Sequence, residues 1–453
     1  MKIRKVKWDN HPVLGDLELD FVNPVTDKSY STVVFAGENG TGKTTILESL
    51  NSFLCFGSFK DFSFIEYETD NGIYRISQSK NSNNFIHHAL VRTNMLTGEI
   101  KNILGDRIGD APGQGDSEDL REYGSVISRP RADYRTNAIT SITSQQLDND
   151  RHESDRDDNF TSLKQLIIDI QSQDGDEYLQ NNQVRSKKKN APLSYEEYYP
   201  MSKIFRFKNA FDSFFITMNY DKVITRNGQK EIIFNKGGKE IEIDKLSTGE
   251  KQIVFRGAFL LKNMNKLKGA VIMIDEPELS MHPKWQKKIL KYYQDLFSNE
   301  QGRLMAQLMV ASHSEAVIGA ALQDLDDTKV LVLNYDVNSI KADGIDKPAI
   351  LPFTLGAEVN YQAFGVLSTD YHNALYGYME AEGWKDDFDA LQDKVLYKKL
   401  KRDGIIEEKR ISLTEKIRHI IHHPENRNNS YSIEELSASI ERMREYIQSR
   451  QNL

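Results

Sequence analysis

The chain has 453 residues, of which 39% are hydrophobic, and a formal net charge of −8. This length corresponds to about three average domains and is sufficient for a sizeable core. A single cysteine, Cys55, excludes a disulfide framework, so we expect a cytoplasmic protein with Cys55 packed among its apolar neighbours. No run approaches the roughly 18 apolar residues of a membrane span. The negative charge gives no general attraction for nucleic acid, so any contact with DNA must be local.

The first 50 residues contain three strand-like segments, at residues 3–8, 17–21 and 32–36. Directly after the third comes the run Gly37-Glu38-Asn39-Gly40-Thr41-Gly42-Lys43-Thr44, and residues 45–50 then follow a helical pattern. A strand, a glycine-rich loop ending in Gly-Lys-Thr and a helix make up a phosphate-binding loop. The alternative is a glycine-rich turn without a ligand, and it leaves the flanking strand and helix unexplained.

This loop predicts ATP as the ligand, together with Mg²⁺. Its glycines allow consecutive N–H groups to point inward, and the following helix adds its positive N-terminal end. We expect Lys43 to reach the β and γ phosphates and the Thr44 hydroxyl to hold Mg²⁺. The candidate nucleotide-binding residues of this segment are Gly37, Asn39, Gly40, Thr41, Gly42, Lys43, Thr44 and Thr45.

A second strand-like run ends in two carboxylates. Residues 270–274 are continuously apolar and are followed by Asp275 and Glu276, as in a Walker B strand covered on both faces. Asp275 is expected to orient Mg²⁺ and Glu276 to polarise the attacking water. The alternative is a solvated helix N-terminus with Pro277 at its first position.

Upstream of that strand, the run Leu246-Ser247-Thr248-Gly249-Glu250 resembles the ABC signature sequence. In ABC ATPases the signature of one subunit covers the γ-phosphate held by the other. The resemblance therefore implies a homodimer, or a higher homo-oligomer, with heads arranged head-to-tail around ATP, and it makes Ser247, Gly249 and Glu250 candidate nucleotide contacts. The alternative is an ordinary capped helix start, because Glu250 stands three residues after Ser247.

A later apolar strand, at residues 310–311, runs into Ser312 and His313. His313 matches the switch histidine of ABC ATPases, which contacts the γ-phosphate or the attacking water. The segment from Glu278 to Pro283, with His282 before the proline, resembles the form found in the RecF, SMC and OLD-like branch of that superfamily. A Q-loop glutamine is expected between the phosphate loop and the signature, where Gln145 and Gln146 are weak candidates.

The segment between the two nucleotide motifs predicts added structure. Residues 66–104 have strand patterns, and the polar residues 105–160 are expected to be partly mobile. The basic run from Arg185 to Lys189 predicts an exposed loop, either solvated or in contact with phosphates. Residues 203–218 have a helical apolar pattern typical of core. Two strands, at 223–225 and 231–234, flank an Asn-Gly hairpin turn.

The tail predicts helices at residues 358–379, 386–400 and 412–422. In the final helix, Ser432 and Glu435 form a capping box and apolar residues recur at spacings of three and four. That apolar face packs either within the chain or against a partner.

The tail also carries a more specific resemblance. The run His422-His423-Pro424-Glu425-Asn426 and the residues 431–440 resemble the C-terminal pattern of the PtuA family, the ABC-type ATPases of the Septu antiphage system. That resemblance implies a partner, a PtuB-like HNH endonuclease, which cuts DNA in trans, so that this chain contacts DNA directly or through the nuclease. Since no histidine follows His423, we expect His422 and His423 to be structural or interface residues rather than metal ligands.

Two other classes remain as alternatives. An OLD-like nuclease requires a strand end with a metal-binding glutamate, which the strand at 330–336 lacks. A DNA-repair clamp ATPase of the RecF or SMC type is distinguished by its gene neighbourhood rather than by its residues.

We therefore expect an α/β fold: a P-loop ABC-type ATPase head, with a mixed sheet and flanking helices, an inserted subdomain and a helical C-terminal region. The predicted parts are 1–60 (first part of the head), 61–220 (insertion), 221–340 (second part of the head) and 341–453 (assembly or partner binding).

Overall fold

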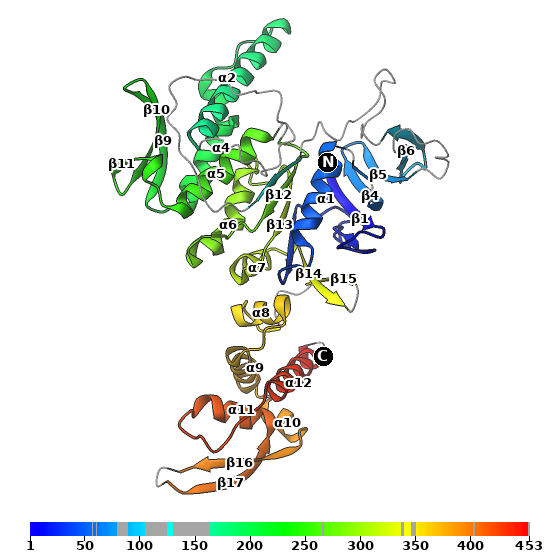
Figure 1. Ribbon diagram of the computed structural model, residues 1–453, viewed down its shortest axis with the longest axis vertical. Helices are drawn as coiled ribbons and strands as arrows, with labels where there is room; N and C mark the ends of the chain where they lie inside the picture. The colour runs from blue at the N-terminus through cyan, green and yellow to red at the C-terminus, as the bar shows by residue number, and fades with distance from the viewer. Residues whose placement is uncertain are drawn as a thin grey trace. The chain divides into compact units, whose positions relative to one another are not determined.

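The computed structural model describes residues 1–56, 58–59, 61–78, 89–104, 125–129, 163–264, 267–336, 339–345, 350–401 and 404–451. The chain divides into two compact units, Met1–Gly344 and Ile345–Leu453. Each unit is described by itself below, with the labels of Figure 1.

The first unit is built on a mixed six-stranded sheet. Its strands, in spatial order, are β15 (Ser339–Gly344), β14 (Thr328–Asp336), β3 (Thr32–Gly37), β13 (Gln307–Ala311), β12 (Val271–Asp275) and β8 (Ser125–Ser128). All neighbours are parallel except β15, which is antiparallel to β14. The three central strands are buried along their whole length, as expected for apolar strands covered on both faces. Their carboxyl ends meet at one edge of the sheet.

A second, antiparallel sheet packs against the same core. Its order is β2 (Glu18–Asp20), β1 (Lys2–Trp8), β4 (Phe62–Thr69), β5 (Gly72–Gln78), β6 (Ala89–Asn94) and β7 (Ile100–Leu104). Helix α1 (Lys43–Phe56) contributes apolar side chains to one cluster shared by both sheets. The strands predicted at residues 3–8, 17–21 and 32–36 are confirmed, as are strands in the described residues 66–78 and 89–104. Because β4 pairs with β1, strands β4 to β7 extend the N-terminal sheet, whereas the prediction grouped 61–220 as one insertion.

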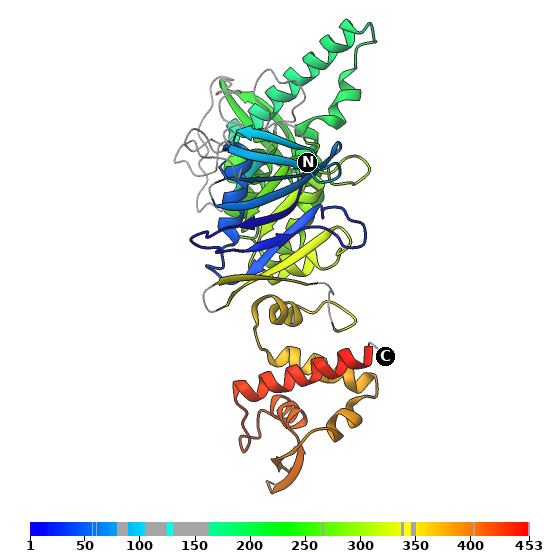
Figure 2. The ribbon, with the colours of Figure 1, turned by 90° about the vertical axis from the view of Figure 1, so that its right-hand side faces the viewer.

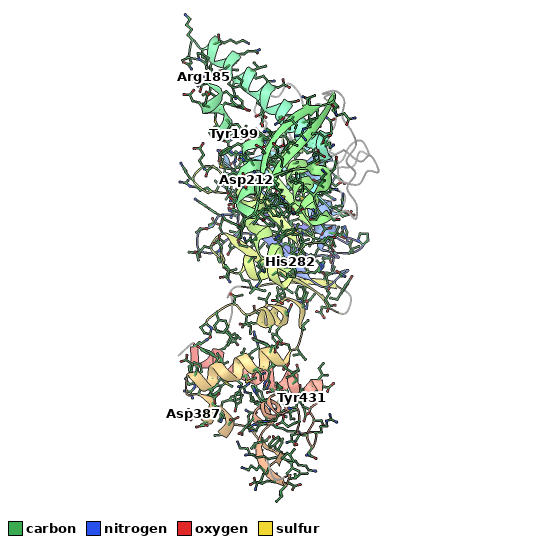
Figure 3. The ribbon with its side chains drawn as sticks, turned by 90° about the vertical axis from the view of Figure 1, so that its left-hand side faces the viewer. Arg185, Tyr199, Asp212, His282, Asp387 and Tyr431 are labelled. Atoms are coloured by element: carbon green, nitrogen blue, oxygen red, sulfur yellow. The ribbon has the colours of Figure 1, made fainter. Side chains whose placement is uncertain are left out.

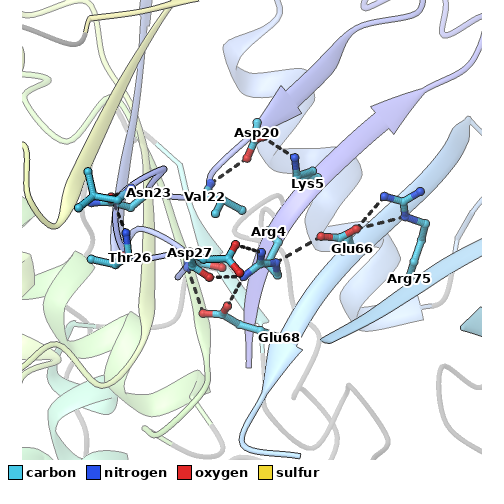
Figure 4. A network of polar contacts seen from close by, with 12 residues as sticks. Arg4, Lys5, Asp20, Val22, Asn23, Thr26, Asp27, Glu66, Glu68 and Arg75 are labelled. Carbon is cyan, nitrogen blue, oxygen red and sulfur yellow. Dashed lines mark hydrogen bonds and ion pairs between the residues drawn. The ribbon is translucent and has the colours of Figure 1, made fainter. Parts of the chain in front are cut away.

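A buried ion network fastens the antiparallel sheet (Figure 4). Arg4 of β1 is only 5% exposed and contacts Asp27, Glu66 and Glu68 at 2.7, 3.3 and 2.9 Å. Arg75 of β5 binds the other oxygen of Glu66 at 2.8 Å. Because a buried guanidinium is tolerated only when its donors are paired, this network fixes β1, β4, β5 and the loop before β3 together.

Helices and a small sheet complete the first unit. The helices are α2 (Leu163–Lys187), α3 (Tyr195–Tyr198), α4 (Lys203–Phe214), α5 (Thr248–Asn263), α6 (Pro283–Leu296) and α7 (Glu315–Ala321), with short 3-10 turns at Tyr199–Met201 and Ile243–Lys245. The three-stranded sheet has the order β11 (Lys239–Glu242), β10 (Gln229–Lys236), β9 (Met218–Arg226). The predicted Asn-Gly hairpin turn is confirmed, since Asn227 and Gly228 both have positive φ. The helix predicted at 203–218 is confirmed as α4 up to Phe214, but Met218 already belongs to β9.

The basic run was predicted wrongly as a loop. Arg185 and Lys187 belong to the last turn of α2 (Figure 3). Basic side chains there interact favourably with the helix dipole, and Arg185 also donates to the Ala191 carbonyl at 2.7 Å. The run therefore begins within a helix, and only its last two residues, Lys188 and Lys189, lie beyond the helix end.

Most of the polar stretch 105–160, with Gln145 and Gln146, lies outside the described residues, so the predictions made there are not tested. The exception is β8, which pairs with β12 in the central sheet and which the sequence analysis missed. Its four residues are too few for a periodic signal. Within the described ranges, no helix combines the length and apolar composition that crossing a bilayer requires.

The second unit is mainly helical (Figure 2). Its elements are α8 (Gly356–Phe364), α9 (Thr369–Ala381), α10 (Lys385–Ala390), β16 (Lys394–Leu400), β17 (Ile406–Ser412), α11 (Leu413–His422) and α12 (Ile433–Gln451). Apolar residues of α12 pack within the unit against α9 and α11. The helix predicted at 386–400 is wrong beyond Ala390, because β16 pairs antiparallel with β17. Leu396 and Leu400, four residues apart, imitate a helical spacing, but both are exposed on the strand.

The loop after α11 has a structural role. Asn426 and Asn429 both donate to the Lys398 carbonyl, at 2.7 and 2.8 Å, and Asn429 accepts from the Lys398 N–H. His423 contacts Glu425 at 3.0 Å, and His422 is exposed. The described residues contain no cluster of three or more potential metal-ligating side chains. The structural or interface role of these histidines stays a prediction.

Candidate nucleotide site

The phosphate loop joins β3 to α1 at the carboxyl edge of the central sheet. Gly37, Gly40 and Gly42 have φ of 139°, 85° and 86°, which other residues adopt only with strain. A Cβ on Gly42 would also collide with the Leu14 side chain, 2.6 Å away. Glu38 to Gly40 are exposed, so the outer rim of the loop is open to solvent. This backbone conformation is compatible with the phosphate cradle expected from the sequence.

Lys43, the first residue of α1, lies inside this cradle. Its side chain is 7% exposed, and its ammonium donates to the carbonyls of Gly37 and Glu38 at 2.8 and 2.7 Å. Burial lowers the pKa of Lys43, while the nearby carboxylates of Asp275 and Glu276 act to raise it. A cation is thus held at the loop where a phosphate anion would need it.

Thr44 and Asp275 meet across the sequence. The Thr44 hydroxyl donates to Asp275 Oδ2 at 2.8 Å, which joins the start of α1 to the end of β12. Asp275 is 5% exposed, and burial raises the pKa of its carboxyl although the Thr44 hydrogen bond acts to lower it. Its second oxygen, Oδ1, is buried without a hydrogen-bond partner in the described part of the chain. A hydroxyl beside an unpartnered carboxylate oxygen is a donor set that suits Mg²⁺.

Glu276 and His313 also come together. Glu276 has φ of 45°, a left-handed conformation that costs about 1–3 kcal/mol for a residue with a side chain. His313 Nδ1 lies 3.5 Å from Glu276 Oε1 and 3.7 Å from Glu278 Oε1. Both the Glu276 and His313 side chains are partly open to solvent. A carboxylate and an imidazole at the ends of adjacent strands can together orient a water molecule.

The signature segment forms the start of another helix, α5. Ser247 is its N-cap: the Ser247 hydroxyl accepts from the Glu250 N–H, and Glu250 accepts from the Ser247 N–H at 2.8 Å. Lys236 also donates to Glu250, at 2.7 Å. Burial acts to raise the pKa of Glu250, but these hydrogen bonds outweigh it and leave the pKa lowered. The capped helix start is therefore observed, and the exposed Ser247 hydroxyl retains a proton to donate.

Gly249 shows why this helix start needs a small residue. A Cβ there would lie 3.1 Å from both the Ser280 carbonyl oxygen and the Trp285 ring. Ser280, with φ of 60°, belongs to the turn after β12, and His282 then caps α6 by accepting from the Lys284 N–H (Figure 3). The signature thus packs against the segment that follows Asp275.

Over residues 33–319, the chain matches the family described as "AAA domain, putative AbiEii toxin, Type IV TA system". The chain belongs to this AAA-domain family. The matched region holds the phosphate loop, the signature segment, Asp275, Glu276 and His313.

Individual proteins resemble this AAA-domain protein over a short segment or at low sequence identity. A segment of 104 residues is 30% identical to the Retron Vc95 probable ATPase of Vibrio cholerae serotype O1 biovar El Tor, and it covers 21% of this chain and 19% of that protein. Among solved structures, the SmcHead bound to the C-winged helix domain of ScpA has a TM-score of 0.40 at 13% identity, over 76% of this chain and 98% of that one. The Smc head domain with an extended coiled coil, bound to the C-terminal domain of ScpA from Pyrococcus furiosus, has a TM-score of 0.35 at 13% identity, over 76% and 96%.

The structure of this AAA-domain protein gathers the predicted residues into two groups. The phosphate loop, Asp275, Glu276 and His313 form one site, whereas Ser247, Gly249 and Glu250 form the start of α5. No hydrogen bond or ion pair between described residues joins the second group to the phosphate loop. A nucleotide contact by Ser247 therefore stays a prediction.

Further residues of the site were missed by the sequence analysis. Arg256 of α5 is fully buried and donates to the Asp275 carbonyl at 2.8 Å. Its signal was a lone charge within an apolar helical run. The Tyr335 hydroxyl donates to the Gly40 carbonyl at 2.9 Å, and Arg129, directly after β8, binds Glu48 of α1 at 2.7 Å. These two contacts depend on strand order, which no local pattern shows.

Proposed function

We propose that this chain binds ATP and Mg²⁺ and hydrolyses the nucleotide in a head-to-tail dimer. The observation that carries the proposal is the meeting of Thr44 with Asp275, whose second oxygen is buried and has no hydrogen-bond partner among the described residues. Two groups that the sequence separates widely converge beside the phosphate loop, and the donor set fits the hydrated cation that accompanies a triphosphate. Thr44 and Asp275 would hold Mg²⁺, which when bound would neutralise phosphate charge.

Each residue of the candidate site then has a part in phosphoryl transfer to water. Lys43 neutralises charge on the β and γ oxygens, and the N–H groups of the loop bind the phosphates. Glu276 accepts a hydrogen bond from the attacking water and aligns it, with His313 beside it. The exposed Ser247 hydroxyl and the N–H groups at the start of α5 in a second copy cover the γ-phosphate.

We further propose that the ATPase belongs to an antiphage defence complex. In that complex it scaffolds and regulates a PtuB-like HNH endonuclease in the cytoplasm, as the resemblance of residues 422–440 to the PtuA family implies. Two names support a place in such a system: the family description includes a putative toxin of a toxin–antitoxin system, and one relative is the probable ATPase of a retron. The second unit, Ile345–Leu453, is the proposed partner-binding region.

Two measurements test these proposals separately. ATP turnover and light scattering of the full chain, with and without ATP and Mg²⁺, test the nucleotide site, and we expect turnover and an ATP-dependent increase in mass. Co-expression with a PtuB-like HNH endonuclease tests the partner. A complex that survives deletion of residues 345–453 would contradict the partner-binding role, and an adjacent set of replication genes would favour the DNA-repair clamp.

A further inference from the structure

Glu278 is a buried carboxylate that the chemistry above does not use. It is 4% exposed and lies in the turn after β12, two residues beyond Glu276. Its Oε1 accepts from the Ser312 hydroxyl at 2.8 Å and from the His313 N–H at 3.1 Å. Its Oε2 is buried with no hydrogen-bond partner in the described ranges. Burying a carboxylate with one oxygen unsatisfied is costly, so a purely structural fastening is a poor explanation for it.

The two hydrogen bonds fix the strand end that carries His313. Ser312 also accepts from the Ser314 N–H at 3.0 Å, and the Ser314 hydroxyl donates to Gln286 of α6 at 2.8 Å. Glu278 is thus one end of a hydrogen-bond network that runs from the turn after β12, through the end of β13, to α6. The position of the His313 backbone is fixed by this hydrogen-bond network as well as by the strand.

The imidazole of His313 faces two carboxylates with the same nitrogen. Nδ1 lies 3.5 Å from Glu276 and 3.7 Å from Glu278, which is within reach of electrostatic attraction but longer than a good hydrogen bond. An imidazole nitrogen that faces carboxylates carries the proton, because N–H is attracted and a lone pair is repelled. Nε2 is then the nitrogen available to the nucleotide or to the attacking water.

We propose that Glu278 is a positioning residue for ATP hydrolysis, which fixes the His313 backbone and selects the Nδ1-protonated form of its ring. The inference rests on the proposed ATPase function. A neutral acceptor could bind the Ser312 hydroxyl without the cost of a buried charge. Only a carboxylate both fixes this strand end and attracts the Nδ1 proton of His313. Glu278 acts through His313 and does not contact the nucleotide itself.

The test compares Glu278→Ala, Glu278→Gln, His313→Ala and the double variant Glu278→Ala/His313→Ala. Loss of a group that orients a catalytic side chain typically costs about 10- to 100-fold, so we expect kcat to fall about 100-fold in Glu278→Ala. Glutamine keeps an acceptor but no charge, so Glu278→Gln should lose only about 10-fold. KM for ATP should stay within about twofold, since no contact with bound ATP is removed. The double variant should turn over ATP as slowly as His313→Ala alone.

Glu358→Gln is the matched control, because Glu358 is a fully buried glutamate of the second unit whose Oε1 accepts from the Ile350 N–H and the Tyr371 hydroxyl. We expect it to lower the thermal midpoint without changing kcat. Wild-type turnover is measured first, and its absence would refute the proposed ATPase and this inference with it. Wild-type turnover with an unchanged kcat in Glu278→Ala, or with additive losses in the double variant, would overturn the role of Glu278 alone. If Glu278→Ala does not fold, the cycle is made with Glu278→Gln.

Discussion

The helix N-termini of the first unit differ in what satisfies their N–H groups. At α4, the carboxylate of Asp174 accepts from the N–H groups of Lys203 and Ile204, both at 2.8 Å. At α5, Ser247 and Glu250 form a capping box. At α1, by contrast, the first turn contains no acidic residue, and no described side chain accepts a hydrogen bond from its N–H groups.

The difference shows how one local feature serves two purposes. Every helix start presents unpaired N–H groups and a positive dipole end. Where the protein supplies its own carboxylate or hydroxyl, the helix start is part of the scaffold. Where glycines and Lys43 surround the helix start and no side chain fills it, the same groups can receive a phosphate. The following predictions test this contrast.

The largest effect is expected for Glu276→Gln. The amide cannot accept the proton that the attacking water loses, so ATP turnover should fall about 1,000-fold while binding persists. ATP would then remain between the start of α1 in one copy and the start of α5 in the other, and light scattering with ATP and Mg²⁺ should show a stable dimer. Glu240→Gln, a change in a surface ion pair, is the control. Undiminished turnover in Glu276→Gln would contradict the assignment of the base.

Lys43→Ala should weaken ATP binding about 100-fold, because charge-assisted contacts to phosphate contribute about 3 kcal/mol. Calorimetric titration with ATP measures the affinity. Lys164→Ala removes another buried lysine, which pairs with Glu231 and Asp244, and it should leave the affinity unchanged. Equal losses of ATP affinity in both variants would mean that the start of α1 is not a specific phosphate site.

The carboxylate of Asp174 at the N-terminus of α4 predicts that the free energy of unfolding depends on pH. Burial raises the pKa of Asp174 to about 6, although the N–H groups of Ile204 and Lys203 act to lower it. Folding therefore favours its protonated form: this contribution to the unfolding free energy is complete below pH about 4 and is lost as pH rises through about 6. We expect a loss of about 2 kcal/mol, allowing for partial solvation. Urea unfolding of the wild type and of Asp174→Asn between pH 4 and 8 measures this loss. Equal slopes of unfolding free energy against pH in the two proteins would contradict the prediction.

The smallest effect on stability is expected for Ser247→Ala. Loss of an N-cap costs about 1 kcal/mol, so the free energy of unfolding should fall by that amount. Ser202→Ala, which removes the cap of α4, is the matched control and should cost as much. Only Ser247→Ala should also abolish the ATP-dependent dimer, as measured by light scattering. If both variants still dimerise with ATP, Ser247 is a cap and nothing more.

Much of the nucleotide site could be predicted because its parts are local. The loop from Gly37 to Thr44 and the strand ending at Asp275 each carry their chemistry within a few residues, flanked by elements with clear periodicity. The pattern around Leu396 and Leu400 was misread, because apolar residues four apart fit either a helix or an exposed strand face. β8 was missed because its burial comes from β12, its distant neighbour in the sheet.

The sequence by itself determined which residues have the chemistry to bind a triphosphate, because glycine, lysine and carboxylate properties are intrinsic to those side chains. Only the tertiary structure decided which of these groups meet. The parallel order β3, β13, β12 brings Thr44 to Asp275 and His313 to Glu276, and the turn after β12 adds Glu278. Strand order is set by the burial of whole strands against distant partners, a long-range property that no short motif contains.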